Sequence, residues 1–236
     1  MTDHCRCRWD KETKKRIPCE DHKREPWKPK RPIYSPLSQD QIYDIGKATE
    51  DSLARALFYF AYMTGARISE AVLFKPYHMT KTDNFWRVRM TVLKKRRIDQ
   101  ATRMVPIPRG EKAKCHEDEM MRDVLEFIRD SPPDGHPFLK WGRERLHKPR
   151  PGKCMAIYLS RKIQVNVEMK KKGDTGVWFT TEELKPLHPH LLRMCRATHL
   201  GDVYGFGDTK IRVFFEWSDS RMAAKYARTA DLESSF

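Results

Sequence analysis

The amino-acid sequence predicts a mainly α-helical fold with one small antiparallel β-hairpin sheet, an α+β arrangement. Apolar residues recur at helical spacing in DSLARALFYFAYMTGARISEAVLF, residues 51–74. Apolar and polar residues, chiefly arginine, alternate instead in NFWRVRMTVLKK, residues 84–95, which is the period of a half-buried strand. RMVPIP, residues 103–108, predicts the return strand of the hairpin. Helical spacing resumes after it, so helices dominate the predicted fold.

The composition favours a globular protein with a polyanionic partner. A chain of 236 residues suits one domain with a small appendage. Lys and Arg number 47 against 32 Asp and Glu, and the net charge of +15 indicates a polyanionic partner. A nucleic acid is the expected partner, and an anionic membrane surface is the alternative. No apolar run approaches the length of about 18 residues that a membrane span needs.

The N-terminus, MTDHCRCRWDK, contains no apolar signal segment, so we expect a cytoplasmic, DNA-associated protein. In that reducing compartment the six cysteines are expected to be thiols or metal ligands, not disulfides.

Residues 1–36 are predicted to form a separate basic arm and proline-rich linker. Within them Cys5, Cys7, Cys19 and His22 follow the pattern C-x-C-x11-C-x2-H. Thiolates and imidazoles are the usual zinc ligands, so these four residues are candidates for a structural zinc site. The first pair is tighter than the common C-x2-C spacing. A solvated basic tail with incidental cysteines therefore stays open as the alternative.

The sequence predicts where the first helix begins and where the next two helices meet. Ser38 has the position of a helix N-cap, and Gln41 can complete a capping box with it. Gly65 is expected to end the long apolar helix, and a second helix through Ile68 follows at once. Arg67 therefore lies at the junction in an apolar setting, where a buried guanidinium without a partner is costly. We expect an anion to meet it.

The remaining elements follow from the same patterns. Residues 116–129 have helical spacing, PPDGHPF predicts a turn, and residues 155–171 predict another helix. Helices are expected again from residue 188, with an interruption near YGFGD.

The segment HPHLLRMCRATHL, residues 188–200, permits a metal, a core or an anion as its partner. A metal would use His188, His190 and His199, but no Cys, Asp or Glu lies nearby to complete a tetrahedral set. His190 and Arg193 are three residues apart, on one helix face close to the N-terminus, which favours an anion.

The rest of that helix has simpler expectations. Leu192 and Cys195 are predicted to pack in the core. Arg196 is predicted to contact DNA backbone.

These pieces resemble, in order and spacing, the catalytic domain of the tyrosine recombinase (phage integrase) family. They are Arg67 in TGARISE, Lys94 and Lys95 in the basic hairpin, His190 and Arg193 in H-x-L-R, and Trp217 followed nine residues later by Tyr226 in FFEWSDSRMAAKYAR. The resemblance covers roughly residues 37–230, and any single motif in it is weak. The final motif and RATHL also resemble archaeal integrase sequences.

The resemblance implies a tyrosine recombinase catalytic-domain fold over residues 37–236 and a covalent mechanism. Tyr226 is expected to attack phosphorus and form a 3′-phosphotyrosyl bond, without a high-energy cofactor or a catalytic metal. Arg67 and Arg193 are expected to bind the non-bridging oxygens of the phosphate. Lys95 is the expected general acid.

The resemblance gives the remaining site residues less direct roles. His190 is expected to help accept or place a proton. Trp217 is expected to hydrogen-bond the phosphate or to buttress the pocket. Lys94 is the alternative to Lys95, because the hairpin turn is longer than is usual in the family.

Each assignment has a structural alternative, and the sequence also departs from the family pattern. Arg67 could instead form a structural ion pair with Glu70, Trp217 could be plain core, and Tyr226 could be an amphipathic surface residue. Met194 stands where the family often has a second histidine. Phe215-Glu216 stands where it often has a leucine-glycine turn, which is expected to reshape that corner of the site.

The function expected from the resemblance is site-specific DNA recombination or integration by a homo-oligomer on paired double-stranded DNA sites. The helical core-binding domain that precedes the catalytic domain in the family has no counterpart in residues 1–36, and the basic arm is expected to reach DNA phosphates in its place. A type IB topoisomerase and a non-catalytic DNA-binding regulator on the same fold are the alternatives.

Overall fold

The computed structural model describes residues 8–10, 12, 15–17, 36–93, 102–139, 151–166 and 189–217. The chain divides into two compact units, residues 1–35 and 36–236. In the first unit, β1 (Arg8–Asp10) and β2 (Lys15–Ile17) form an antiparallel hairpin that the sequence did not predict. Cys5, Cys7, Cys19 and His22 lie outside the described residues.

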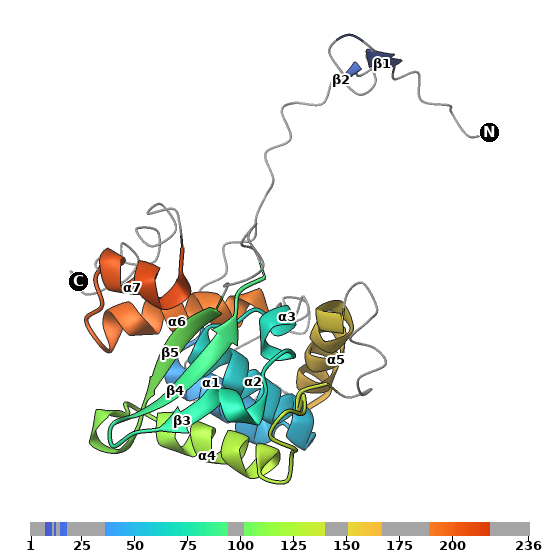
Figure 1. Cartoon of the computed structure of the whole chain (residues 1–236). Coiled ribbons are helices and arrows are strands. Elements are labelled where there is room, and N and C mark those ends of the chain that lie inside the picture. Colours follow the sequence, from blue (N-terminus) through green and yellow to red (C-terminus); the bar gives the residue numbers. More distant parts are fainter. Residues whose placement is uncertain are drawn as a thin grey trace, which may run out of the picture. The chain divides into compact units, whose positions relative to one another are not determined.

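The second unit contains seven described helices and one three-stranded sheet (Figure 1). The helices are α1 (Gln39–Ala48), α2 (Ser52–Thr64), α3 (Ile68–Ala71), α4 (Glu117–Ile128), α5 (Pro151–Asn166), α6 (His190–Asp202) and α7 (Asp208–Phe215). The strands are β3 (Met79–Lys81), β4 (Phe85–Thr91) and β5 (Thr102–Pro108), antiparallel in the order β3-β4-β5. This is the predicted fold class, with β3 and short 3-10 turns at Pro76–His78 and Gly110–Lys112 added.

Helix α2 is the central element of this unit, and α1, α4, α5 and α6 all pack against it. Its side chains are buried almost continuously from Ala56 to Thr64, as expected for a helix that is apolar on every side. The helix ends as predicted at Gly65, which has a left-handed φ of 58°. A Cβ added there would lie 2.2 Å from the Phe215 ring, so glycine is required for both conformation and space.

Helix α1 begins with the predicted capping box. The Gln41 backbone N–H donates to the Ser38 hydroxyl at 3.1 Å, and the Ser38 N–H donates to the Gln41 side-chain oxygen at 2.7 Å. Two amide groups that would lack helical partners are thereby satisfied, which fixes where the chain enters the helical body.

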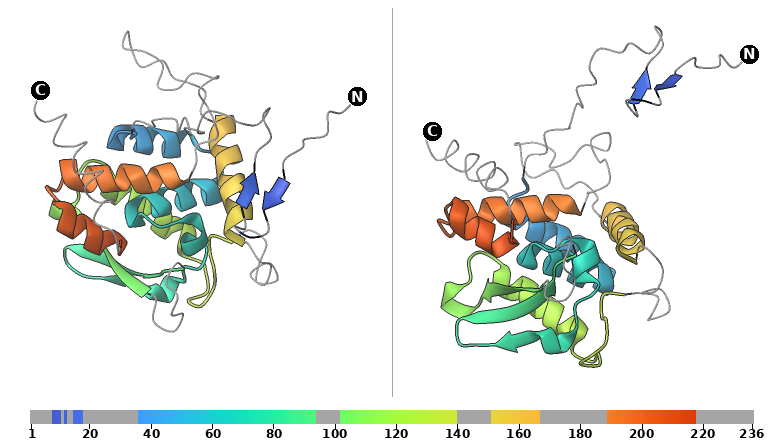
Figure 2. Two further views of the ribbon diagram at one scale, coloured as in Figure 1. Left: turned by 90° about the horizontal axis from the view of Figure 1, so that it is seen from above. Right: turned by 45° about the horizontal axis from the view of Figure 1, so that its top comes forward.

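The sheet confirms the predicted hairpin and its two faces. Val88 and Met90 on β4 are buried against the helices, whereas Arg87 and Arg89 are exposed. On β5 the buried positions include Arg103, which shares its face with the apolar Val105 and Ile107. The sheet covers one side of the helical body (Figure 1), and α6 and α7 lie side by side (Figure 2).

The prediction that Arg196 contacts DNA backbone is wrong. Arg196 is fully buried, and its guanidinium donates to the Glu117 carboxylate, which also accepts from the Tyr204 hydroxyl. Burial alone disfavours the charged guanidinium, but the adjacent Glu117 carboxylate outweighs that effect and raises the pKa of Arg196. Leu192 and Cys195 pack in the core as predicted.

Candidate functional site

Arg67 lies at the junction of α2 and α3, as the sequence predicted, and its anionic partner is Glu70. The Arg67 Nη1 is 2.6 Å from the Glu70 Oε1, and the Arg67 backbone N–H donates to the Glu70 Oε2 at 3.0 Å. The Glu70 carboxylate is 1% exposed, whereas the Arg67 side chain is 26% exposed. The ion pair therefore exists, and it holds a partly accessible guanidinium in a fixed orientation.

Arg193 reaches the same carboxylate from α6. Its Nη1 lies 4.0 Å from the Glu70 Oε2, so the two arginines meet at Glu70 although they are far apart in the sequence. The Arg193 side chain is 3% exposed. Its Nη1 donates to the Gly65 carbonyl at 2.5 Å and its Nη2 to the Phe215 carbonyl at 3.1 Å. These bonds engage two of the five N–H groups that a guanidinium carries.

Arg103 bridges two helix-end carbonyl groups in the same way as Arg193, and the sequence patterns did not identify it. Its Nη1 donates to the Phe214 carbonyl at 2.6 Å, and its Nη2 donates to the Thr64 carbonyl at 2.9 Å. Burial lowers the pKa of Arg103 to about 10, so the guanidinium remains charged at neutral pH. The alternation along the return strand could have predicted that Arg103 is buried, because position 103 faces the same side of the strand as the buried Val105 and Ile107.

The two bridges join the ends of two helices, and we call this region the α2–α7 junction. It comprises the carbonyl groups of Thr64, Gly65, Phe214 and Phe215 with the guanidinium groups of Arg103 and Arg193. The last carbonyl groups of a helix have no intrahelical donor, and they carry the negative end of the helix dipole. Two buried cations are therefore suited to hold the two helix ends together.

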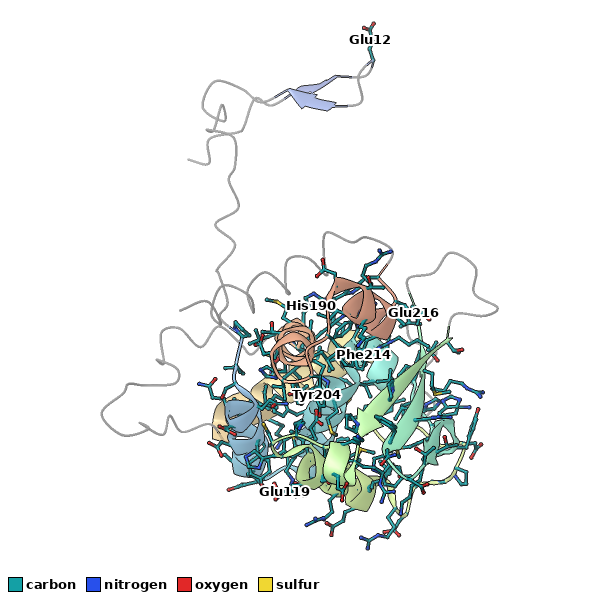
Figure 3. The ribbon with its side chains drawn as sticks, turned by 90° about the vertical axis from the view of Figure 1, so that its left-hand side faces the viewer. Glu12, Glu119, His190, Tyr204, Phe214 and Glu216 are labelled. Carbon is teal, nitrogen blue, oxygen red and sulfur yellow. The ribbon has the colours of Figure 1, made fainter. Side chains whose placement is uncertain are left out.

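Trp217 lies beside this junction, and His190 begins the helix that carries Arg193. The Trp217 ring stacks on Phe215 with centroids 4.6 Å apart, and the Arg193 guanidinium lies 5.5 Å from the Trp217 ring. His190 is the exposed first residue of α6, three positions before Arg193. Figure 3 labels His190 at the start of α6, with Phe214 and Glu216 at the end of α7. Trp217 thus packs beside Arg193, in a buttressing position.

The residues at the predicted departure, Phe215 and Glu216, form the end of α7 just before Trp217. Glu216 caps α7 in a left-handed conformation, with φ 49° and ψ 46°. Glycine adopts this conformation without steric cost, whereas glutamate does so at a cost of about 1–2 kcal/mol. A non-glycine residue makes this left-handed turn here, and it places a carboxylate next to the junction.

Three other predicted residues, Lys94, Lys95 and Tyr226, lie outside the described residues. Of the six predicted catalytic residues, the structure describes Arg67, His190, Arg193 and Trp217. It brings Arg67, Arg193 and Trp217 into one cluster.

Of the three histidines in residues 188–200, the structure describes His190 and His199, whereas His188 lies outside the described residues. His199 is 6% exposed, and its Nδ1 lies 2.8 Å from the Tyr62 hydroxyl. Burial and, to a smaller extent, the nearby Arg196 guanidinium together lower the pKa of His199 to about 4. No group of three or more His, Cys, Asp or Glu among the described residues could hold a metal ion.

The described helices also bear on the membrane question. None of them combines the length and the apolar character that crossing a bilayer requires.

The model of the phage integrase family matches residues 36–233. None of the curated proteins matches the sequence.

Solved recombinase structures share the fold. XerA recombinase is 17% identical, with 84% of this chain and 61% of that chain covered and a TM-score of 0.51. A lambda integrase dimer bound to a COC′ core site is 16% identical, with 82% and 47% covered and a TM-score of 0.50. XerH bound to a palindromic difH substrate is 14% identical, with 84% and 51% covered and a TM-score of 0.50. The chain thus spans about half to three fifths of the length of these proteins.

Proposed function

Since the chain belongs to the phage integrase family, we propose that it is a site-specific DNA recombinase that cleaves and rejoins DNA through a covalent tyrosine intermediate. The observation that carries the proposal is the meeting of Arg67 and Arg193 at the Glu70 carboxylate. Two guanidinium groups held near one point suit a phosphodiester, whose non-bridging oxygens gain charge in the transition state.

The proposed reaction conserves the energy of the phosphodiester bond. The Tyr226 oxygen attacks phosphorus, a bond from phosphorus to tyrosine forms, and the bond from phosphorus to the 5′-oxygen breaks. Lys95, or Lys94 in its place, donates a proton to the departing 5′-oxygen. His190 accepts or places the tyrosine proton. Attack by a 5′-hydroxyl on the phosphotyrosine reverses these steps and rejoins a strand, so neither a metal nor a high-energy cofactor is required.

The surroundings of the two arginines support preorganised charge at the proposed site. Glu70 orients Arg67 through a 2.6 Å contact, and two carbonyl groups fix the Arg193 guanidinium. Trp217 packs beside Arg193 and limits its movement. Charged groups that are held before substrate binds need little reorganisation during reaction, and such electrostatic stabilisation is often the largest catalytic contribution.

The proposed partner is double-stranded DNA, bound by a homo-oligomer on paired sites. The net charge of +15 supports a polyanionic partner. The matched lambda integrase structure contains a dimer on a core site, which supports the same mode of assembly for this chain. Residues 1–36 contribute further Lys and Arg side chains for phosphate contacts in this proposal.

Trapping of a covalent protein–DNA adduct tests the proposal. Duplexes of random sequence that each carry a nick serve as substrate, because cleavage next to a nick releases a short 5′-hydroxyl fragment and prevents rejoining. Wild type is expected to form an adduct that resists detergent, and Tyr226→Phe is expected to bind the duplexes without forming one. Tyr77→Phe is the matched control, since Tyr77 is an exposed tyrosine at 54% away from the cluster.

Two outcomes would contradict the proposal. DNA binding by wild type without any adduct would favour a non-catalytic regulator. Adduct formation together with relaxation of any supercoiled DNA by a monomer would favour a type IB topoisomerase.

A further inference from the structure

Arg103 and Arg193 make the same connection, one residue apart on both helices. Arg193 joins the Gly65 carbonyl to the Phe215 carbonyl, whereas Arg103 joins the preceding residue of each helix, Thr64 to Phe214. The two arginines come from different elements, α6 and β5. The connection between α2 and α7 is therefore duplicated, and only one of its two arginines belongs to the predicted catalytic set.

A long apolar side chain at position 103 would pack but would not make this connection. The neighbours of Arg103 on the inner face of β5 are Val105 and Ile107, both fully buried. Methionine at position 103 could fill similar space, yet it would leave the carbonyl groups of Thr64 and Phe214 without their donors. A buried carbonyl that loses its donor is destabilising, so the helix ends would be expected to separate or shift.

A shift at the end of α7 would reach the proposed site through Phe215. The ring of Phe215 lies 4.6 Å from the Arg193 guanidinium and stacks at 4.6 Å on Trp217. The Arg103 guanidinium lies 6.0 Å from the same ring. Because Phe215 also supplies one carbonyl acceptor of Arg193, the position of α7 determines where Arg193 and Trp217 are held relative to Arg67.

We propose that Arg103 is a positioning residue for strand cleavage, which fixes the α2–α7 junction so that Arg193 and Trp217 are correctly placed beside Arg67. Arg103 acts through these residues and does not touch the reacting phosphate. The inference rests on the proposed function, since it names a residue on which the activity of that site depends.

Arg103→Met and Arg103→Lys test this role against a matched control, Arg55→Met. Arg55 also donates to a helix-end carbonyl, that of Thr49 at 3.4 Å, but at the end of α1. The full-length variants are compared at a temperature at which circular dichroism finds each fully folded. The first readout is the indole N–H resonance of Trp217 in ¹⁵N-labelled protein, assigned with Trp217→Phe. The second is the rate of adduct formation, measured together with DNA affinity.

Arg103→Met is expected to shift the Trp217 resonance and to slow adduct formation about a hundred-fold, because displacements near 1 Å have effects of this size. DNA affinity is expected to stay within about two-fold of wild type, since the charged surface is unchanged. Arg103→Lys, which can reach one carbonyl at a time, is expected to recover part of the rate. Arg55→Met is expected to match wild type in both readouts.

A folded Arg103→Met protein with the wild-type Trp217 resonance, or with a wild-type rate of adduct formation, would overturn the inference alone. An equal loss of rate in Arg55→Met would also overturn it, because the effect would then be one of general stability. Absence of any adduct in wild type would overturn the proposed function, and this inference with it.

Discussion

At the scale of single residues, two separate constraints require glycine at position 65 of the α2–α7 junction, its left-handed backbone and the close Phe215 ring. Alanine there would meet the Phe215 ring at 2.2 Å in addition to adopting a φ of 58°. We expect Gly65→Ala to lower the free energy of unfolding by about 3 kcal/mol or more, from left-handed strain of about 1–2 kcal/mol plus overpacking. Urea denaturation measures the loss.

Gly110 supplies the control for that prediction. Its φ is 56°, but a Cβ added there would meet nothing within 4 Å. Gly110→Ala should therefore lose only the strain energy, about 1–2 kcal/mol. Equal losses in the two alanine variants would show that contact with Phe215 contributes nothing to the cost at Gly65.

His199 makes stability depend on pH. Burial lowers its pKa to about 4, below the ordinary 6.5, so the unfolded chain binds more protons between these values. The stability that His199 contributes is complete above about pH 6.5 and decreases as the pH falls towards 4. At about pH 5 the loss is expected to be about 2 kcal/mol relative to neutral pH.

His199→Gln isolates this contribution, because glutamine can hydrogen-bond Tyr62 without titrating. Urea denaturation at about pH 7.5 and about pH 5 should show a smaller acid-induced loss in His199→Gln than in wild type. Identical losses in the two proteins would assign the acid sensitivity to other groups.

At the scale of elements, Glu117 and Arg196 connect α4 to α6 through a fully buried ion pair. We expect Arg196→Met to lower the free energy of unfolding by about 3–5 kcal/mol, because it leaves an uncompensated buried carboxylate. Adding Glu117→Gln should restore part of that loss, since the neutral amide can still accept from Tyr204. A double variant no more stable than Arg196→Met would contradict this account.

The pair of Lys47 and Asp123, in which the lysine is exposed, provides a comparison for the same measurement. Their charged atoms are 3.3 Å apart, but the Lys47 side chain is 45% exposed. Solvent screens such a pair, so Lys47→Met should cost less than about 1 kcal/mol.

The elements that the sequence predicted have strong local signals. The apolar spacing of α2, the alternation of β4 and β5, and the capping box at Ser38 all depend on near neighbours in the chain. Strand β3 has only three residues and comes directly after the 3-10 turn at Pro76–His78, so no period could reveal it. Helix α5 begins at Pro151, four residues before the predicted start, because proline suits the first turn of a helix.

Residues of the candidate site were predictable from the sequence only where they belong to a recognisable motif. Arg67, Arg193 and Trp217 were identified from motifs, and the structure brings them together. Arg103 and Arg196 were assigned no buried role, because their partners lie in α2, α7 and α4. A basic residue gives no local sign of whether its acceptor is DNA, a carbonyl group or a buried carboxylate.

At the scale of the whole molecule, the arm in residues 1–36 is proposed to bind one structural zinc ion through Cys5, Cys7, Cys19 and His22. Metal analysis of the purified protein should find about one zinc per chain, matching a four-ligand site. The double variant Cys5→Ser, Cys7→Ser should lose the metal. Cys154→Ser, which removes an exposed cysteine of α5, is the control. Sub-stoichiometric zinc in folded wild type would contradict the proposal.

The α2–α7 junction also has a consequence for synthesis of the chain. The bond from Arg193 to Gly65 spans 128 residues and that from Arg103 to Phe214 spans 111, so both depend on late closure of long loops. The ribosome adds Arg67 and Arg103 to the growing chain long before it adds Phe214 and Phe215. A polypeptide terminated upstream of α7 therefore carries those arginines without the Phe214 and Phe215 acceptors, so the site cannot assemble until α7 has been translated.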